Sequence, residues 1–370
     1  MRVQKIFCLA PYCFLPAKTG GQKAIDAFYR LLSLQAEVVC ISTKNNDTAA
    51  DETPYRVKRV LSNSSLRYIN IFYPFKLIRL IRQENPALLE MEQPYFGWMM
   101  VPVKRITSKP LLVRSHNIEG LRFKTIGKWW WKIMWRYEKW VYQKAEHIFF
   151  ITDEDRKYAI EKMGVDQTKA VTIPYSIEQT AAPSLAKKQI ARRNLLVRHG
   201  LKESDTLLLF NGAFDYLPNV EALRELLPHF NAFGKQNPRF KLIICGKDIP
   251  KDMIADKQNQ EVIFAGFVPD ISEYFLGADV FLNPVVTGGG IKTKLVEALA
   301  NNLTALSFTQ GAIGIDPAWC NGKLIVVENH DWQSFLNFIE PATEIRTSVG
   351  KAFFDHFSTA SQLEKIKGIL

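Results

Sequence analysis

The sequence has 370 residues, of which 47% are hydrophobic and 23% are charged. This composition is typical of a soluble globular protein with sizeable cores, and the length predicts about two domains. The chain has no uninterrupted apolar run of about 18 residues, which argues against a membrane-spanning helix.

The basic charge is concentrated in the first half of the chain. Residues 1–180 contain 28 Lys and Arg against 17 Asp and Glu, a net charge of +11, whereas residues 181–370 contain 20 of each. This asymmetry indicates an anionic partner for the first half: a phospholipid surface, a phosphate-bearing acceptor or nucleic acid. An effect on solubility alone is the alternative. Because no nucleic-acid-binding motif is recognisable, nucleic acid is not an expected partner.

The N-terminal stretch MRVQKIFCLAPYCFLPA is a candidate signal peptide. Pro11 interrupts its short apolar run, and no convincing small-residue cleavage site follows. We therefore interpret residues 3–10 as a buried strand. The five cysteines are odd in number and show neither a disulfide framework nor zinc-site spacing, so a reducing cytoplasm is the expected location.

Short apolar runs of strand length alternate with helical patterns in both halves. In the first half, the expected strands are 3–10, 37–43, 87–91, 110–115 and 145–152, and the first helix is 22–34. In the second half, the expected strands are 206–211, 240–245, 262–265, 280–283 and 304–308, and a helix covers about 220–233. This alternation indicates an α/β protein with parallel sheets covered on both faces. A linker is expected near 175–195, and the loops at the carboxyl ends of the strands should face a cleft between the halves.

The segment 127–147 holds five of the eight tryptophans. Helical periodicity gives it a core face that consists of Ile133, Met134, Tyr137 and Val141. Aromatic and basic residues share the remaining surface, which suits a membrane interface, while a packed helix with snorkelling cations is the simpler interpretation.

Other motifs in the sequence give weaker evidence of a binding or catalytic site. The loop TGGQ lacks the G-x-G-x-x-G spacing of a dinucleotide site, and no G-x-S-x-G nucleophile motif occurs. The acidic run 153–155 is interpreted as the first turn of a helix rather than a metal site.

The stretch VVTGGGIKTKLVEALANN carries the strongest signal. Gly288, Gly289 and Gly290 follow a strand and lead into a helix, so a ligand can approach the backbone closely. Successive N–H groups and the helix N-terminus favour an anion there, and phosphate is the natural ligand.

The helix that follows has two distinct faces. At 100° per residue its apolar face consists of Ile291, Leu295, Ala298 and Leu299. Thr293, Lys294 and Glu297 form a polar stripe, and Lys292 can lean over the glycines. One or both lysines could meet a diphosphate while Glu297 accepts bonds from a ribose diol. A solvated Lys–Glu pair is the alternative.

These residues resemble a known family. NPVVTGGGIKTKLVEALANN and the later TQGAIGID are similar to the nucleotide-sugar site of retaining glycosyltransferases of the GT-B fold, the "group 1" family. FNGAFDYLPNVEAL, LIICGKDIP and VIFAGFVPD resemble other segments of the same donor domain. AKTGGQKA, RSHNIEGLRF and FITDEDR are similar to counterparts in the first domain. The resemblance covers nearly the whole chain.

The resemblance implies two Rossmann-like doubly wound domains that face a cleft. Residues 1–177 would bind the acceptor, 178–353 the donor, and 354–370 would form a C-terminal helix that packs back on the first domain. The implied site residues are Gly20, Gly21, His116, Gly212, Lys247, Val268, Gly288, Gly289, Gly290, Ile291, Lys292, Lys294 and Glu297. Glu297 would bind the ribose, the lysines the diphosphate, Val268 the base, and His116 the donor sugar. For Lys247, a solvated turn is an equal alternative.

One position departs from the family pattern. Many members carry a second glutamate eight positions before the equivalent of Glu297, where this chain has Gly289, so the donor sugar is open. The expected activity is retaining, metal-independent transfer of a sugar from a UDP- or GDP-linked donor to a glycan or lipid-linked acceptor, with no further cofactor. The expected place is the cytoplasm or the inner face of the membrane, in cell-surface polysaccharide or glycolipid synthesis. The alternatives are a sugar-nucleotide epimerase and a non-catalytic nucleotide-sugar-binding protein.

Overall fold

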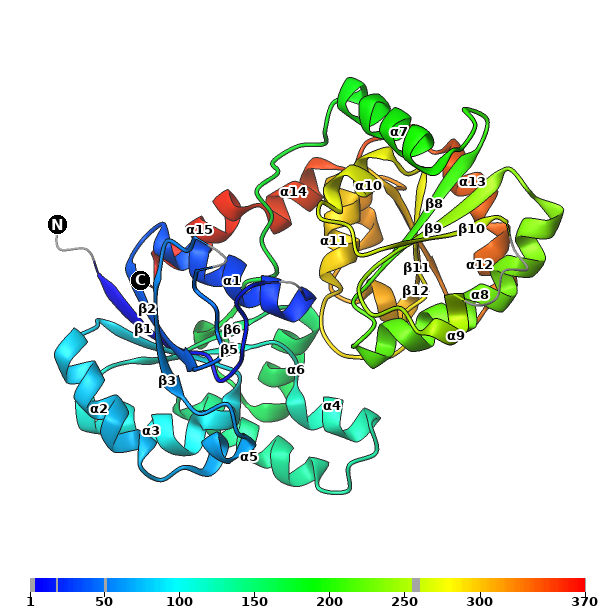
Figure 1. Ribbon diagram of the computed structural model, residues 1–370. Helices are drawn as coiled ribbons and strands as arrows, with labels where there is room; N and C mark the ends of the chain where they lie inside the picture. Colours follow the sequence, from blue (N-terminus) through cyan, green and yellow to red (C-terminus); the bar gives the residue numbers. More distant parts are fainter. Residues whose placement is uncertain (1–3, 18, 50–51, 255–259, 370) are drawn as a thin grey trace. The chain divides into compact units, whose positions relative to one another are not determined.

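The backbone forms two compact units (Figure 1). The computed structural model describes residues 4–17, 19–49, 52–254 and 260–369. Unit 1 comprises Met1–Ser176 and Phe357–Leu370, and unit 2 comprises Ile177–His356. Each unit is built around one parallel sheet with helices, as the alternating apolar runs predict.

Unit 1 contains a seven-stranded parallel sheet in the order β3-β2-β1-β4-β5-β6-β7. The strands are β1 (Lys5–Leu9), β2 (Glu37–Thr43), β3 (Arg56–Leu61), β4 (Leu88–Glu92), β5 (Leu111–Ser115), β6 (His147–Phe150) and β7 (Ala170–Thr172). The apolar runs predict five of these strands but not β3 and β7. Both lie at edges of the sheet, where a strand can be half exposed or short, and β3 has the charged sequence RVKRVL.

Helices cover both faces of this sheet. The helices α1 (Gly20–Ser33) and α15 (Thr359–Lys367) contact each other and share a core cluster on one face. The helices of the opposite face are α2 (Tyr73–Glu84), α3 (Gly97–Thr107), α5 (Trp131–Lys144) and α6 (Asp153–Met163). The short helix α4 (Glu119–Thr125) packs on α5. The packing of α15 confirms that the C-terminal helix returns to the first domain.

The predicted single C-terminal helix is in fact two helices. α14 (Lys351–Phe357) ends just before Ser358, whose extended backbone interrupts the helix. The Ser358 hydroxyl then accepts a hydrogen bond from the backbone N–H of Ser361 and so caps α15.

Unit 2 contains a six-stranded parallel sheet in the order β10-β9-β8-β11-β12-β13. The strands are β8 (Thr206–Asn211), β9 (Phe240–Cys245), β10 (Val262–Gly266), β11 (Val280–Asn283), β12 (Thr304–Phe308) and β13 (Leu324–Val327). All but the short edge strand β13 are predicted from the sequence. The parallel sheets of both units confirm the predicted α/β fold class.

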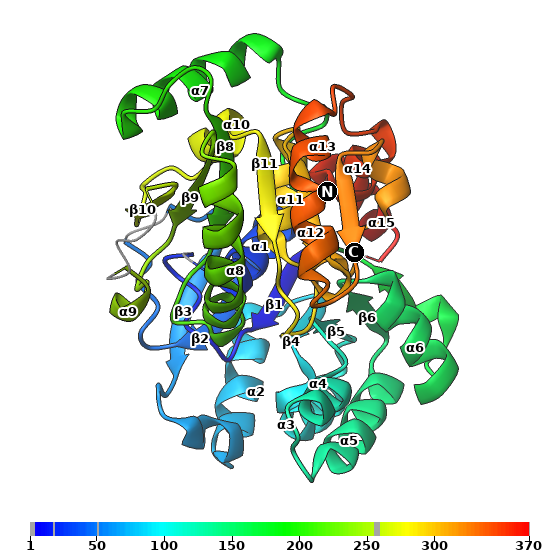
Figure 2. The same cartoon turned by 90° about the vertical axis from the view of Figure 1, so that its right-hand side faces the viewer.

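The helices of unit 2 are α7 (Leu185–His199), α8 (Leu217–Gln236), α9 (Lys251–Ile254), α10 (Ser272–Gly277), α11 (Thr293–Ala300), α12 (Trp332–Asn337) and α13 (Ile339–Glu344). α8 and α12 pack on each other, as Figure 2 shows, and join one core with α13 on one sheet face. α10 and α11 also contact the sheet. The prediction of a linker as far as 195 is wrong, because Ser184 caps α7 and the basic run forms its first turns.

Two predicted helix details are corrected by the structure. α11 begins at Thr293 rather than Ile291, because Lys292 has extended backbone angles and is the N-cap residue. On α5, Met134 and Val141 are buried as predicted, but Ile133 is 60% exposed.

The order of strands reverses between β1 and β4 in unit 1 and between β8 and β11 in unit 2. In open α/β sheets ligands bind beyond the carboxyl ends of the strands at such reversal points. Gly212 follows β8 directly, and the glycine run follows β11. Gly212, the glycine run and the residues that begin α11 therefore lie around this reversal point, whereas Lys247 and Val268 follow β9 and β10.

Candidate functional site

The loop from β11 to α11 exposes its backbone N–H groups. In the part of the chain that the structure describes, no N–H group from Gly288 to Lys292 donates a hydrogen bond to the protein. The N-cap residue of α11 also makes no side-chain cap. A row of free donors at a helix N-terminus is an arrangement that binds anions.

The backbone conformation of this loop also explains why glycine occupies two of its positions. Gly288 and Gly290 have φ angles of +80° and +68°, which other residues rarely adopt. A Cβ atom on Gly288 would also lie 2.6 Å from the hydroxyl oxygen of Tyr216. Gly289 lies between them, at the position where many members of the similar family carry a glutamate.

Lys292 folds back over the glycines instead of extending along the helix. Its Nζ donates to the carbonyl oxygens of Gly288, Gly289 and Gly290 at 3.1, 3.3 and 3.0 Å. Burial lowers the pKa of Lys292 to about 8. The side chain thus fixes the shape of the loop and places positive charge beside its free N–H groups.

Lys294 connects three elements at the reversal point. Its Nζ donates to the carbonyl of Asn211 at 3.0 Å and to Oδ1 of Asn219 at 2.9 Å, and lies 4.9 Å from the ring centre of Phe210. Burial, together with the charge of Lys292, lowers the pKa of Lys294 to about 7. Among the described residues, neither lysine has a carboxylate partner. Such a pair of cations favours an anionic ligand.

The neighbouring strands β8 and β11 each end in an asparagine, and neither asparagine is among the site residues predicted from the sequence. The Oδ1 atoms of Asn211 and Asn283 are buried and accept no hydrogen bond in the described part of the chain. Nδ2 of Asn283 donates to Ser307 Oγ and the Gly311 carbonyl. An asparagine at a strand end is a common feature, so the sequence held no distinctive signal for them.

Glu297 lies on α11, three residues after Lys294, and is half-buried. Gly212 packs against Asn219, because a Cβ atom at Gly212 would lie 2.7 Å from Cγ of that side chain. Ile291 is half-buried in the loop just before the helix. The structure therefore keeps Glu297, Gly212 and Ile291 around the loop and the start of α11.

The remaining donor residues of unit 2, Lys247 and Val268, follow the strands β9 and β10. Val268 is half-buried two residues beyond β10 and follows Phe267, which is 65% exposed. Lys247 lies in an exposed turn after β9 and forms an ion pair with Asp248 at 3.1 Å. In this arrangement an adjacent carboxylate lies close enough to balance the charge of Lys247.

In unit 1, Gly20 and Gly21 form the first turn of α1 rather than a loop before it. Thr19 and Gln22 close a capping box around this turn. Among the described residues, no atom beyond its chain neighbours and its own helix backbone lies within 4 Å of a Cβ built on Gly21, so packing does not require glycine there.

His116 follows β5 and is held by a buried carboxylate. Its Nε2 is hydrogen-bonded to Oε2 of Glu92, and its backbone N–H donates to Oε1 of Gln93. Arg114 Nη1 donates to the other oxygen of Glu92 at 3.1 Å. Because Nε2 is occupied, Nδ1 is the ring nitrogen that remains for a ligand.

Glu90 and Glu92 on β4 are both fully buried, but their pKa values are shifted in opposite directions. Burial raises the pKa of Glu92, but Arg114 and His116 outweigh it and hold that pKa below its usual range. Burial and the nearby Glu92 raise the pKa of Glu90 well above its usual range. Glu92 is therefore the anion that orients His116, whereas burial favours the neutral form of Glu90.

The acidic run after β6 begins a helix, as predicted. Asp153, Glu154 and Asp155 are the first turn of α6, and the hydroxyl of Thr152 accepts from the N–H of Asp155.

Among the described residues, no three His, Cys, Asp or Glu side chains cluster as ligands of a metal ion would. All five cysteines are free. The described chain also has no helix whose length and apolarity would let it span a bilayer.

Both halves of the chain match models of known families. Residues 22–179 match Glycosyltransferase Family 4, and residues 205–342 match Glycosyl transferases group 1. A relative from Klebsiella pneumoniae, an uncharacterised 44.6 kDa protein in the cps region, is 22% identical over 361 residues, which cover 88% of each chain.

Solved structures share the fold over almost the whole chain. Anabaena HepE, crystallised with UDP and glucose, is 14% identical with a TM-score of 0.73 and 99% coverage of both chains. The sucrose-phosphate synthase of Thermosynechococcus elongatus is 14% identical with a TM-score of 0.76, covering 99% of this chain and 98% of that one. These similarities confirm the GT-B fold.

Proposed function

The chain belongs to the group 1 glycosyltransferases, and from this premise we propose that it transfers a sugar from a UDP- or GDP-linked donor to an acceptor hydroxyl group. Unit 2 binds the donor in this proposal, and unit 1 binds a glycan or lipid-linked acceptor. The cps-region relative and the complexes of HepE with UDP and with UDP-glucose support this choice. We place the activity in cell-surface polysaccharide or glycolipid synthesis at the inner face of the membrane.

The observation that carries the proposal is the group of anion-binding donors at the start of α11. Free N–H groups, the helix dipole and two lysines without a carboxylate partner lie together. Among the described residues, no carboxylate forms an ion pair with Lys292 or Lys294, so a diphosphate would balance their charge. Glu297 would accept hydrogen bonds from the ribose hydroxyls, and the backbone at Val268 would hold the base.

The chemistry follows from the same groups. When the bond between the anomeric carbon and the diphosphate oxygen breaks, negative charge grows on the leaving group, and the N–H groups, Lys292 and Lys294 stabilise it. A new bond forms from the acceptor oxygen to the same carbon, and the acceptor proton passes to the departing phosphate. Attack on the face that the diphosphate leaves gives retention of configuration. Nδ1 of His116 would bind a hydroxyl of the donor sugar, and Gly20 and Gly21 would approach the diphosphate.

A thermal-shift screen of UDP- and GDP-sugars tests the proposal first. A ligand at about 100 times its Kd stabilises the folded state by about 2.7 kcal/mol, which is a rise of a few degrees in Tm. Slow hydrolysis of the same donor to sugar and nucleotide, and transfer to an added acceptor, should follow. No Tm rise with any nucleotide sugar would overturn the proposal.

The same assays separate the two alternatives. Epimerised donor formed without an acceptor would identify an epimerase. Binding with neither hydrolysis nor transfer would identify a non-catalytic binding protein, for which Gly289, in place of a sugar-contacting glutamate, is the favouring observation.

A further inference from the structure

Unit 1 exposes a compact set of large apolar side chains between β3 and α2. They are Leu66, Ile69, Ile71, Phe72 and Phe75, which are 66–73% exposed. The first two lie on the short 3-10 helix Ser65–Ile69, and the rest lie at the start of α2. We name these five residues the apolar patch. An isolated exposed apolar residue is ordinary, but five within ten positions mark a contact surface.

The fold does not need these side chains for its core. α2 buries Tyr73, Leu77 and Ile81, which are four residues apart and form one stripe. The other face of the helix is left to solvent.

The segment around the patch is held in place by polar contacts. Nε of Arg67 donates to the Pro11 carbonyl at 2.9 Å, and Nε1 of Trp98 donates to the Tyr68 carbonyl at 2.9 Å. The patch is therefore displayed by an anchored segment and forms no part of the core.

Basic residues continue the patch along α2. Residues 62–83 contain Arg67, Lys76, Arg79 and Arg82 and no acidic residue. Lys76, Arg79 and Arg82 have no carboxylate partner among the described residues. The acid at the end of the helix, Glu84, is already paired with Lys5, Arg56 and Lys58.

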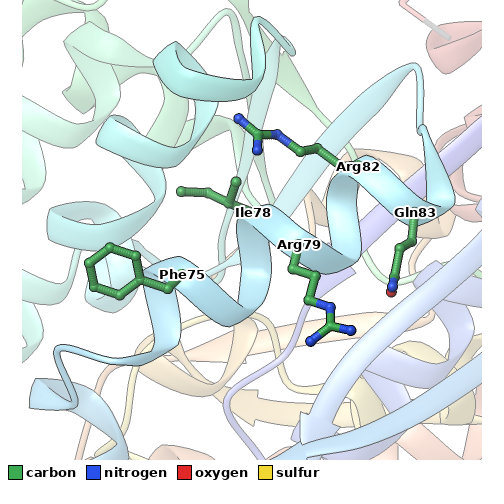
Figure 3. A pocket seen from close by; sticks show the side chains of 5 residues that line it. All are labelled: Phe75, Ile78, Arg79, Arg82 and Gln83. Atoms are coloured by element: carbon green, nitrogen blue, oxygen red, sulfur yellow. The ribbon is translucent and has the colours of Figure 1, made fainter.

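A surface pocket joins the apolar and basic parts. It has a volume of about 430 Å³ and is lined by Phe75, Ile78, Arg79, Arg82 and Gln83. Figure 3 shows these side chains on successive turns of α2, with Phe75 at one end and Gln83 at the other. The lining of this pocket therefore includes an aromatic side chain and two arginines.

We propose that the apolar patch and the basic face of α2 dock this protein on a bilayer of anionic phospholipids. A free anion would satisfy the arginines but leave five apolar side chains in water, whereas a bilayer satisfies both. The patch enters the acyl boundary, and Lys76, Arg79 and Arg82 lie at the phosphate level. The inference deepens the proposed function, on which it rests for the lipid-linked acceptor.

The tryptophan-rich helix α5 is the weaker candidate for this role. Cations lie over two of its rings: Lys124 and Lys132 lie over Trp131, and Lys139 lies over Trp135. We therefore place the proposed membrane contact on α2 and not on α5.

The test is co-sedimentation of the full chain with vesicles of phosphatidylcholine alone or with about 30% phosphatidylglycerol. Wild-type protein should bind the anionic vesicles at least tenfold better, and added salt should weaken binding. Phe72→Ser/Phe75→Ser and Arg79→Glu/Arg82→Glu should each lower binding at least tenfold. The matched controls on α5, Ile133→Ser and Lys132→Glu/Arg136→Glu, should bind within twofold of wild type.

Each variant is also checked for its Tm and for its thermal shift with nucleotide sugar. Lost vesicle binding with an unchanged nucleotide response supports the docking surface, whatever the transferase assay shows. Equal vesicle binding by wild type and the α2 variants overturns the inference, as does equal loss in the α5 controls. A third outcome also overturns the inference: wild type binds no vesicles but forms a dimer, and Phe72→Ser/Phe75→Ser abolishes that dimer. The apolar patch would then be a contact with a second copy of this chain.

Discussion

The ammonium of Lys294 lies 2.9 Å from Oδ1 of Asn219, so that helix α11 is tied to the start of α8 across the end of β8. Both of its hydrogen-bond acceptors are neutral, and its charge remains unbalanced. The contact positions a cation without neutralising it, which is what a site for a diphosphate requires.

Replacing Lys294 by methionine should therefore separate binding from stability. Methionine fills similar space without the buried charge, so the variant should unfold at the same temperature as wild type or higher. Its affinity for a nucleotide sugar should fall at least tenfold, because a charge-assisted hydrogen bond of about 1.5–3 kcal/mol is lost. Calorimetric titration and a melting curve measure both. Unchanged affinity would remove Lys294 from the site.

Binding should also depend on pH. The pKa of Lys294 is lowered to about 7, and a bound diphosphate raises it again, so binding takes up a proton above pH 7. Affinity for an intact nucleotide sugar, whose diphosphate stays ionised, should fall by up to about tenfold per pH unit from pH 7 to 9. Titrations in buffers of different ionisation enthalpy would reveal the proton uptake, and Lys294→Met should reduce it.

The stability of the ligand-free protein should move in the opposite direction over this range. In the unfolded chain the pKa of Lys294 returns to about 10.5, so the unfolded state binds more protons than the folded state between pH 7 and 10.5. The contribution of Lys294 to the free energy of unfolding therefore rises with pH. Urea denaturation of wild type and Lys294→Met at several pH values isolates this contribution by difference.

Local sequence signals predicted the sheets and the glycine loop well. A buried parallel strand needs a continuous apolar run, and residues 206–211 and 280–283 show one. The edge strand β3 and the helix α7 were missed because half-exposed elements carry charges like those of a linker. The exact start of α11 was wrong because Lys292 folds onto three carbonyls, which no periodicity indicates.

Glu92 could not be predicted because its role depends on tertiary pairing. In the run LLEME it resembles a charge at the end of an apolar strand. The register of β4 on β5 sets Glu92 directly beside Arg114, and the following turn returns His116 to the same carboxylate. His116 itself was found only through a resemblance, and its ligand remains a prediction.

We expect Glu92→Gln to impair both folding and catalysis. Arg114 would keep a buried charge without a counter-ion, which costs about 3–5 kcal/mol of unfolding free energy. The imidazole of His116 would lose its fixed orientation, and kcat should fall about tenfold or more. Glu90→Gln is the control, because this buried carboxyl group on the same strand accepts from the hydroxyl of Tyr29, whereas Arg114 and His116 bond to Glu92, and it should change neither quantity greatly.

If Glu92 supports catalysis only by orienting His116, substitutions at the two residues should not have additive effects on kcat. The double variant Glu92→Gln/His116→Ala should then have the kcat of His116→Ala alone. Additive losses in the double variant would instead assign Glu92 a separate role.

Glu297 should determine the affinity for the nucleoside part. Removing the carboxylate in Glu297→Ala takes away the acceptor for the ribose hydroxyls and should weaken UDP or GDP binding about tenfold to a hundredfold. Wild type should bind a 2′,3′-dideoxy nucleotide as weakly as the variant binds the normal one. If the variant and wild type bind UDP and GDP equally, the ribose is held elsewhere.

Alanine at two glycines should have opposite effects. Gly288 has a φ of +80°, and a Cβ there meets the Tyr216 hydroxyl at 2.6 Å, so Gly288→Ala should lower the unfolding free energy by about 1–3 kcal/mol. Gly21 lies in a helix with open space around it, so Gly21→Ala should raise stability by up to about 1 kcal/mol. If the backbone at Gly21 approaches the diphosphate, Gly21→Ala should nevertheless lower the transfer rate. A stable Gly21→Ala variant with full activity would leave Gly21 outside the site.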